Sequence, residues 1–201
     1  YAYKSKSEGG IWEEGDLRRD ESIRYDFTYL GITPTEVSWG ADELDPHIKK
    51  YEDERTDQFN GNLANEWYSG KNFIVLRYAD VLLCYAECLN ELGETGQANT
   101  IVNQVRARAW GGTLPNEMAW NYGQDEFRTQ IMNERIRELC FEGWRRMDLI
   151  RTGKFVELIK ERNSWAKKSG TIKDFHMRYP IPDTEIKNND DISEEDQNPG
   201  Y

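Results

Sequence analysis

The stretch that decides the fold is RYADVLLCYAECLNELG, residues 77–93. Five residues within and just before it recur at steps of three and four: Leu76, Ala79, Leu83, Ala86 and Asn90. This spacing draws one stripe along a helix, and such a stripe faces a core. Gly93 suits the left-handed position that ends a helix, and Thr95 suits the cap that begins another. The sequence therefore predicts two helices joined by a short link.

The second predicted helix keeps the same period until Trp110-Gly111-Gly112 ends it. Its small and apolar positions are Ala98, Ile101, Val102, Val105 and Ala109. A short link makes the two helices antiparallel, and their alanines let the backbones approach closely. We therefore expect a mainly α fold, with a tetratricopeptide-like helical hairpin, further helices and long loop-rich flanks.

A third predicted helix carries charges beside its apolar arc, which consists of Ile131, Met132, Ile136 and Leu139. Buried charges persist only when they are paired and hydrogen-bonded. We therefore expect an ion-pair network in the core, whose members pair with each other or with Arg77 and Asp80. These members are Arg135, Glu138, Glu142, Arg145 and Asp148. The alternative is a solvated charged face.

Two irregular flanks enclose the helical block. We expect a loop-rich, ligand-facing part at residues 1–70, with a short strand near 22–29. The helical core is expected at residues 72–161, and an irregular C-terminal segment at 162–201. Connections this long without regular structure are uncommon in compact domains unless they bind something.

Aromatic residues of the first third are the candidate binding residues, because aromatic faces stack on the C–H faces of sugar rings. Trp39 and Trp67 come first, followed by Tyr68 and Trp12. The alternative for each is a loop residue that covers the helical core. Four aromatics of the helical block are expected to pack inside: Phe73, Tyr78, Tyr85 and Phe141.

Composition excludes several function classes. The net charge of -11, without a basic stripe, argues against nucleic acid and anionic membrane surfaces. No apolar run approaches the roughly 20 residues that span a bilayer. We interpret Cys84, Cys88 and Cys140 as small buried hydrophobic residues, not disulfides. His47 and His176 lack a partner at ligand spacing, so we expect no metal and no cofactor.

Three motifs follow one another along the chain: residues 77–93; NERIRELCFEG at 133–143; and YPIP at 179–182 with QNPGY at 197–201. Together with EGDLRRD at 14–20, they resemble the C-terminal region of the SusD/RagB family, the nutrient-binding lipoproteins of the Bacteroidetes outer membrane. The resemblance implies non-catalytic binding of a nutrient, usually a glycan, at the extracellular face, and its delivery to a TonB-dependent SusC-like transporter. It also implies an N-terminal part carrying a lipid anchor, which is not in this chain and which would be the only attachment to the membrane.

Two other classes of protein remain open. A carbohydrate-active hydrolase would use Glu138 and Glu142, one turn apart, as its carboxyl pair. Neighbouring Arg135 and Arg145 would keep both ionised, which removes the protonated acid that the reaction needs. The third class is a helical scaffold that docks a protein partner. Aromatics in an open concavity would favour glycan binding, whereas a continuous aliphatic groove would favour the scaffold.

Overall fold

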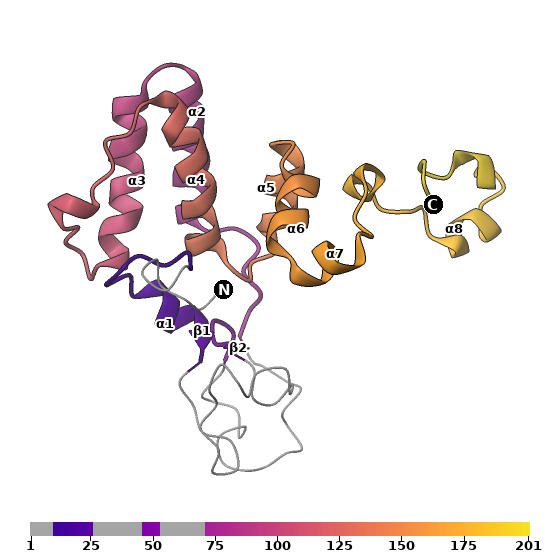
Figure 1. Cartoon of the computed structure of the whole chain (residues 1–201), viewed down its shortest axis with the longest axis horizontal. Coiled ribbons are helices and arrows are strands. Elements are labelled where there is room, and N and C mark those ends of the chain that lie inside the picture. Colours follow the sequence, from indigo (N-terminus) through magenta and orange to yellow (C-terminus); the bar gives the residue numbers. More distant parts are fainter. Residues whose placement is uncertain (1–9, 26–45, 53–70) are drawn as a thin grey trace, which may run out of the picture. The chain divides into compact units, whose positions relative to one another are not determined.

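The computed structural model describes residues 10–25, 46–52 and 71–201 (Figure 1). It is mainly helical, as the sequence predicts, and the chain divides into two compact units at residues 145 and 146. Within the described ranges, no helix has both the length and the apolar character needed to cross a bilayer.

The core of the first unit lies between three helices (Figure 1): α2 (Tyr78–Glu91), α3 (Thr95–Ala109) and α4 (Gln124–Leu139). Gly93, with φ of 85°, turns the chain between α2 and α3, which confirms the predicted link. Helix α2 packs against both α3 and α4. The buried core residues are Leu83, Ala86, Leu89, Ala98, Val102, Val105, Trp120, Phe127 and Ile131.

Asparagines on the helices hold the connection between α3 and α4, which includes the short 3-10 helix η5 (Asn116–Met118). The side chain of Asn103 donates to the Trp120 carbonyl at 3.0 Å and accepts from the Trp120 amide at 2.7 Å. Asn99 makes the same pair of bonds with Tyr122, at 2.9 and 3.2 Å. The connection is therefore fixed although it contains little regular structure.

The described part of the first third is a small substructure that lies against the helices. It contains α1 (Arg18–Ser22), β1 (Ile23–Arg24) and β2 (His47–Ile48). The two strands are antiparallel, with Ile23 opposite Ile48 and Arg24 opposite His47. Strand β1 lies where the sequence predicts a strand, whereas α1 is not predicted.

The chain continues with α5 (Trp144–Arg151) and then with short elements. These are α6 (Phe155–Arg162), α7 (Ser164–Ser169), η6 (Asp174–Met177), α8 (Asp183–Asn188) and η7 (Glu194–Asp196). The short helices after α6 are not predicted, because each is too short to show a period.

Helix α2 is apolar on two faces, and only one face is buried. Tyr78 and Tyr85 are 73% and 50% exposed, and in the segment before the helix Phe73 and Leu76 are 65% and 61% exposed. The prediction that these side chains pack inside is therefore wrong, and so is that for Phe141, at 37% exposure. The spacing shows that apolar residues share a face, but it cannot decide which of two apolar faces meets the core.

The three cysteines are free, as expected, but they are not buried. Cys84 and Cys88 are exposed and Cys140 is half-buried. The interpretation of all three as core residues is therefore wrong, because Cys84 and Cys88 turn away from the buried side of α2 that Leu83 and Ala86 define.

Candidate functional site

Three glutamates at a spacing of four residues organise the charged centre of the first unit. Glu134 and Glu138 lie on α4, and Glu142 follows the end of that helix. They are 0%, 2% and 4% exposed. We call Glu134, Glu138 and Glu142 the glutamate cluster. Carboxylates buried this deeply require cationic partners.

Glu134 has three arginine partners. Its carboxylate lies 2.7 Å from Nη1 of Arg18, 3.0 Å from Nη1 of Arg106 and 2.7 Å from Nη2 of Arg137. Burial on its own raises the pKa of Glu134. The charges of Arg18, Arg137 and Arg106 outweigh burial and hold this pKa well below its usual range.

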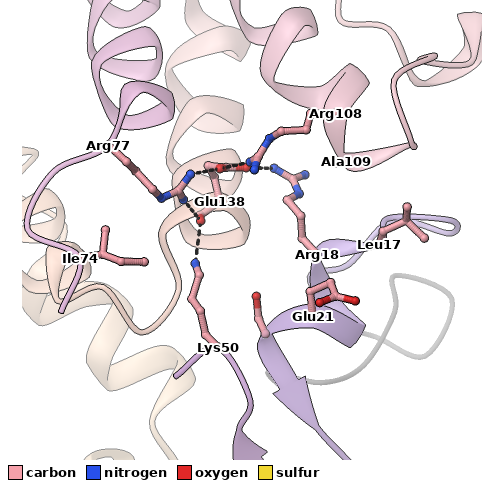
Figure 2. A pocket seen from close by; sticks show the side chains of 10 residues that line it. Leu17, Arg18, Glu21, Lys50, Ile74, Arg77, Arg108, Ala109 and Glu138 are labelled. Atoms are coloured by element: carbon pink, nitrogen blue, oxygen red, sulfur yellow. Dashed lines mark hydrogen bonds and ion pairs between the residues drawn. The ribbon is translucent and has the colours of Figure 1, made fainter. Parts of the chain in front are cut away.

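Glu138 is also surrounded by arginines (Figure 2). One carboxylate oxygen accepts from Arg18 at 2.9 Å, and the other accepts from Arg77 and Arg108. Burial opposes ionisation here too, but Arg18, Arg77 and Arg108 lower the pKa of Glu138. The carboxylate therefore stays charged at neutral pH.

Glu142 joins two segments that are distant in the sequence. Nε of Arg77 lies 2.9 Å from one carboxylate oxygen, and Nζ of Lys50 lies 2.5 Å from the other. Lys50 also donates to the carbonyls of Glu138 and Cys140, at 3.1 and 3.2 Å. The residues before α2 and those after β2 are therefore fastened to the end of α4.

A cavity of about 420 Å³ lies beside Glu138 (Figure 2). Its lining residues are Leu17, Arg18, Glu21, Ser22, Lys50, Ile74, Arg77, Arg108, Ala109 and Glu138. The guanidinium of Arg18 and the ammonium of Lys50 are engaged by carboxylates or carbonyls, and Arg77 is engaged by Glu138 and Glu142. None of the lining residues that the structure describes is aromatic. The described part of the lining consists of segments that are distant in the sequence and are joined by ion pairs.

The predicted ion-pair network is confirmed in part. Arg77 binds Glu138 and Glu142 as expected. Arg135 forms a separate buried pair with Asp80, with 2.9 Å between Nη1 and the carboxylate. Asp148 lies 2.9 Å from Arg151.

Sequence reasoning missed most of the cations that complete the network. They are Arg18, Lys50, Arg106, Arg108 and Arg137, with Asp16 and Glu13 as further anions. Arg18 and Lys50 are 116 and 92 residues away from the glutamates they bind, and helical periodicity carries no information over such distances. Asp16 and Arg18 lie in EGDLRRD, residues 14–20, which is one of the motifs on which the family resemblance rests.

Of the four predicted ligand-binding aromatics, Trp39, Trp67 and Tyr68 lie outside the described residues. Trp12 is 1% exposed. Burial of Trp12 agrees with the alternative given for each of these residues, and we do not include Trp12 in the proposed ligand platform.

The arrangement does not provide the chemistry of a glycosidase. Glu138 and Glu142 are both paired with cations, and the pKa of Glu138 is lowered, whereas a general acid needs a raised pKa. In the part of the chain that the structure describes, no three His, Cys, Asp or Glu side chains gather as metal ligands.

Comparison with known proteins gives the family. The sequence pattern described as the SusD family matches residues 4–201. SusD-like protein P38 of Formosa agariphila is 40% identical over 155 residues, which are 74% of this chain and 28% of that protein. The starch-binding protein SusD of Bacteroides thetaiotaomicron is 28% identical over 159 residues, which are 77% of this chain and 26% of that protein. The chain belongs to the SusD family.

The fold of the chain is also similar to that of a SusD homolog. The crystal structure of a SusD homolog from Bacteroides thetaiotaomicron matches 93% of this chain and 41% of its own, with a TM-score of 0.66 and 27% identity. The chain spans 25% to 30% of the length of three curated relatives from Formosa agariphila. Proteins of this family are non-catalytic binding proteins of the outer membrane.

Proposed function

We propose that the full-length protein binds a nutrient glycan at the extracellular face of the outer membrane and passes it to a TonB-dependent SusC-like transporter. The observation that carries this proposal is the family match over residues 4–201. The glutamate cluster agrees with it, since its three carboxylates are paired with cations inside the fold.

The proposed ligand platform consists of Trp39, Trp67 and Tyr68. The first of them lies between β1 and β2, whose pairing holds the two ends of the intervening segment next to each other. The other two lie between Lys50 and Arg77, which both bind Glu142. Loops carried on a rigid base are where binding residues concentrate, and a base of buried ion pairs supports this role.

Calorimetry on the full-length protein tests the platform, with a neutral oligosaccharide chosen from a glycan array as the ligand. Trp39→Ala and Trp67→Ala should each weaken binding by about 2 kcal/mol, roughly thirtyfold in Kd, because each removes a stacking surface. Tyr78→Ala is the matched control, since Tyr78 is 73% exposed on α2. Unchanged affinity in both tryptophan variants, with intact circular dichroism, would mean that the platform lies elsewhere.

The scaffold function has one observation in its favour. Tyr78, Val81, Tyr85 and Leu92 form an exposed apolar stripe along α2, at the spacing with which one helix packs on another. The curated relatives are much longer than the matched region. In a protein of that length the rest of the chain can cover such a stripe as readily as a separate partner can, so glycan binding remains the function that we propose.

A further inference from the structure

The segment 154–168, which contains α6 and α7, differs in charge from the rest of the chain. It holds five cationic and two anionic side chains, a net charge of +3 in a chain of net charge -11. Lys154 pairs with Glu157 at 3.0 Å, and Arg162 lies 4.0 Å from Glu161. Among the residues that the structure describes, no carboxylate lies within 4.0 Å of the ammonium groups of Lys160, Lys167 and Lys168.

Trp165 lies within this cationic segment. It is 80% exposed, more than any other large apolar side chain in the described ranges. Helix α7 is fixed beneath it, because the side chain of Asn163 caps the amide of Ala166 at 2.9 Å and Gly170 ends the helix in the left-handed conformation. The indole is therefore presented to solvent by an ordered helix.

Trp165 and Lys168 are three residues apart on α7, so their side chains are neighbours on one face of the helix. Lys167 is exposed as well, but it lies two residues from Trp165 and therefore on another side of the helix. We call Trp165 and Lys168 the α7 patch. It combines an aromatic face with an ammonium group that has no carboxylate partner among the described residues.

We propose that the α7 patch is a contact site for acidic polysaccharide, meaning a glycan that carries uronate carboxylates or sulfate esters. The indole stacks on the C–H face of a sugar ring, and Lys168 pairs with an acidic group of the same glycan. This inference rests on the proposed function and names a substrate class for it. It concerns a different surface from the Trp39 and Trp67 platform.

The composition of the patch favours a glycan over a lipid surface. A helix that lies on a membrane needs a broad apolar face. In this segment Phe155 is buried, and Val156, Leu158 and Ile159 are half-buried within their own unit. Trp165 is thus the one large apolar side chain that the segment presents to solvent, which suits a single sugar ring.

Affinity electrophoresis or calorimetry of the full-length protein tests the proposal. The probes are polygalacturonate for carboxylates, dextran sulfate for sulfates and unmodified dextran as the neutral control. We expect the native protein to bind at least one acidic polymer more tightly than dextran. Trp165→Ala should weaken that binding about tenfold, from loss of stacking, and Lys168→Gln about threefold, from loss of one charge pair.

Lys187→Gln is the matched control, because Lys187 is an exposed lysine on another helix of the same unit, α8. An equal loss in this variant would mean that net charge alone drives binding, and it would overturn the proposal. No preference for acidic polymers over dextran would overturn it as well. So would binding to phosphatidylglycerol vesicles that depends on Trp165, since the patch would then recognise a membrane.

These experiments distinguish a failure of this inference from a failure of the proposed function. If the protein binds no glycan on an array, the proposed function fails. If it binds glycans through Trp39 and Trp67 but the α7 patch variants bind acidic polymers normally, only the further inference fails.

Discussion

At the scale of single residues, the buried carboxylates of the glutamate cluster stabilise the fold by joining several segments of the chain. Glu138 is 2% exposed and accepts hydrogen bonds from Arg18, Arg77 and Arg108, which come from three different segments. Removing a buried carboxylate leaves its cationic partners without compensation, and such a loss exceeds the net contribution of the intact pair.

Glu138→Ala is therefore expected to lower the free energy of unfolding by about 3 to 5 kcal/mol. The exposed pair between Lys154 and Glu157 gives a matched control, since Glu157→Ala should cost at most about 1 kcal/mol. Denaturant melts of the two variants measure both values. A loss below about 1 kcal/mol for Glu138→Ala would mean that the charged face is solvated in solution.

The sequence predicts part of this cluster, and the reason is local. Glu138 and Arg135 interrupt the apolar arc of one helix, so a pattern on that helix reveals them. Arg18 and Lys50 come from irregular segments with no period, and only the tertiary fold brings them to Glu134 and Glu142. The sequence does not predict the burial of Trp12 either, because Trp12 also lies in an irregular segment without a period.

At the scale of elements, the C-terminal motifs form a clasp, which we define as residues 178–181 with 197–201. The amide side chain of Gln197 accepts from the Ile181 N–H at 2.8 Å and donates to the Ile181 carbonyl at 3.0 Å. Asn198 donates to the Tyr179 carbonyl at 2.7 Å, and the Tyr201 hydroxyl donates to the Arg178 carbonyl at 2.9 Å. Two motifs that are separate in the sequence thus form one structural unit.

Gly200 is a residue of the clasp with no room for a side chain. Its φ is +101°, and a Cβ atom there would lie 2.4 Å from Cγ of Phe175. Gly200→Ala should therefore speed hydrogen exchange at the Ile181 amide at least tenfold, which corresponds to about 1.4 kcal/mol of local stability.

Gly170→Ala is the control for this variant, because Gly170 also has a positive φ, of +62°, but has nothing within 4 Å of the added Cβ. It carries the backbone strain without the overlap. Equal protection of Ile181 in the native protein and in Gly200→Ala would show that the clasp does not depend on this close approach.

Helix α2 shows what a periodic sequence pattern can and cannot predict about one helix. The period predicts the helix and its buried stripe, since Leu83, Ala86 and Asn90 are 0% exposed. It does not predict the exposure of Tyr78 and Tyr85, because the helix has a second apolar stripe on its outer face. Short helices such as α7 and α8 depend on caps and neighbouring turns, which leave no period in the sequence.

At the scale of the whole molecule, our proposal is that the full-length protein binds a glycan and does not act on it. The family match and the shared fold support binding. Arginine partners lower the pKa of Glu134 and of Glu138, whereas a general acid needs a raised pKa. We therefore expect that a glycan is bound and that it is released unchanged.

One calorimetric titration of the full-length protein tests both claims together, with an oligosaccharide chosen from a glycan array as the titrant. We expect a saturable binding heat, with the signal returning to baseline after every injection. Reducing ends in the cell should stay at the level of a Glu138→Gln/Glu142→Gln control. A heat signal that continues after mixing, with reducing ends above that control, would mean that the protein is a hydrolase and not a binding protein.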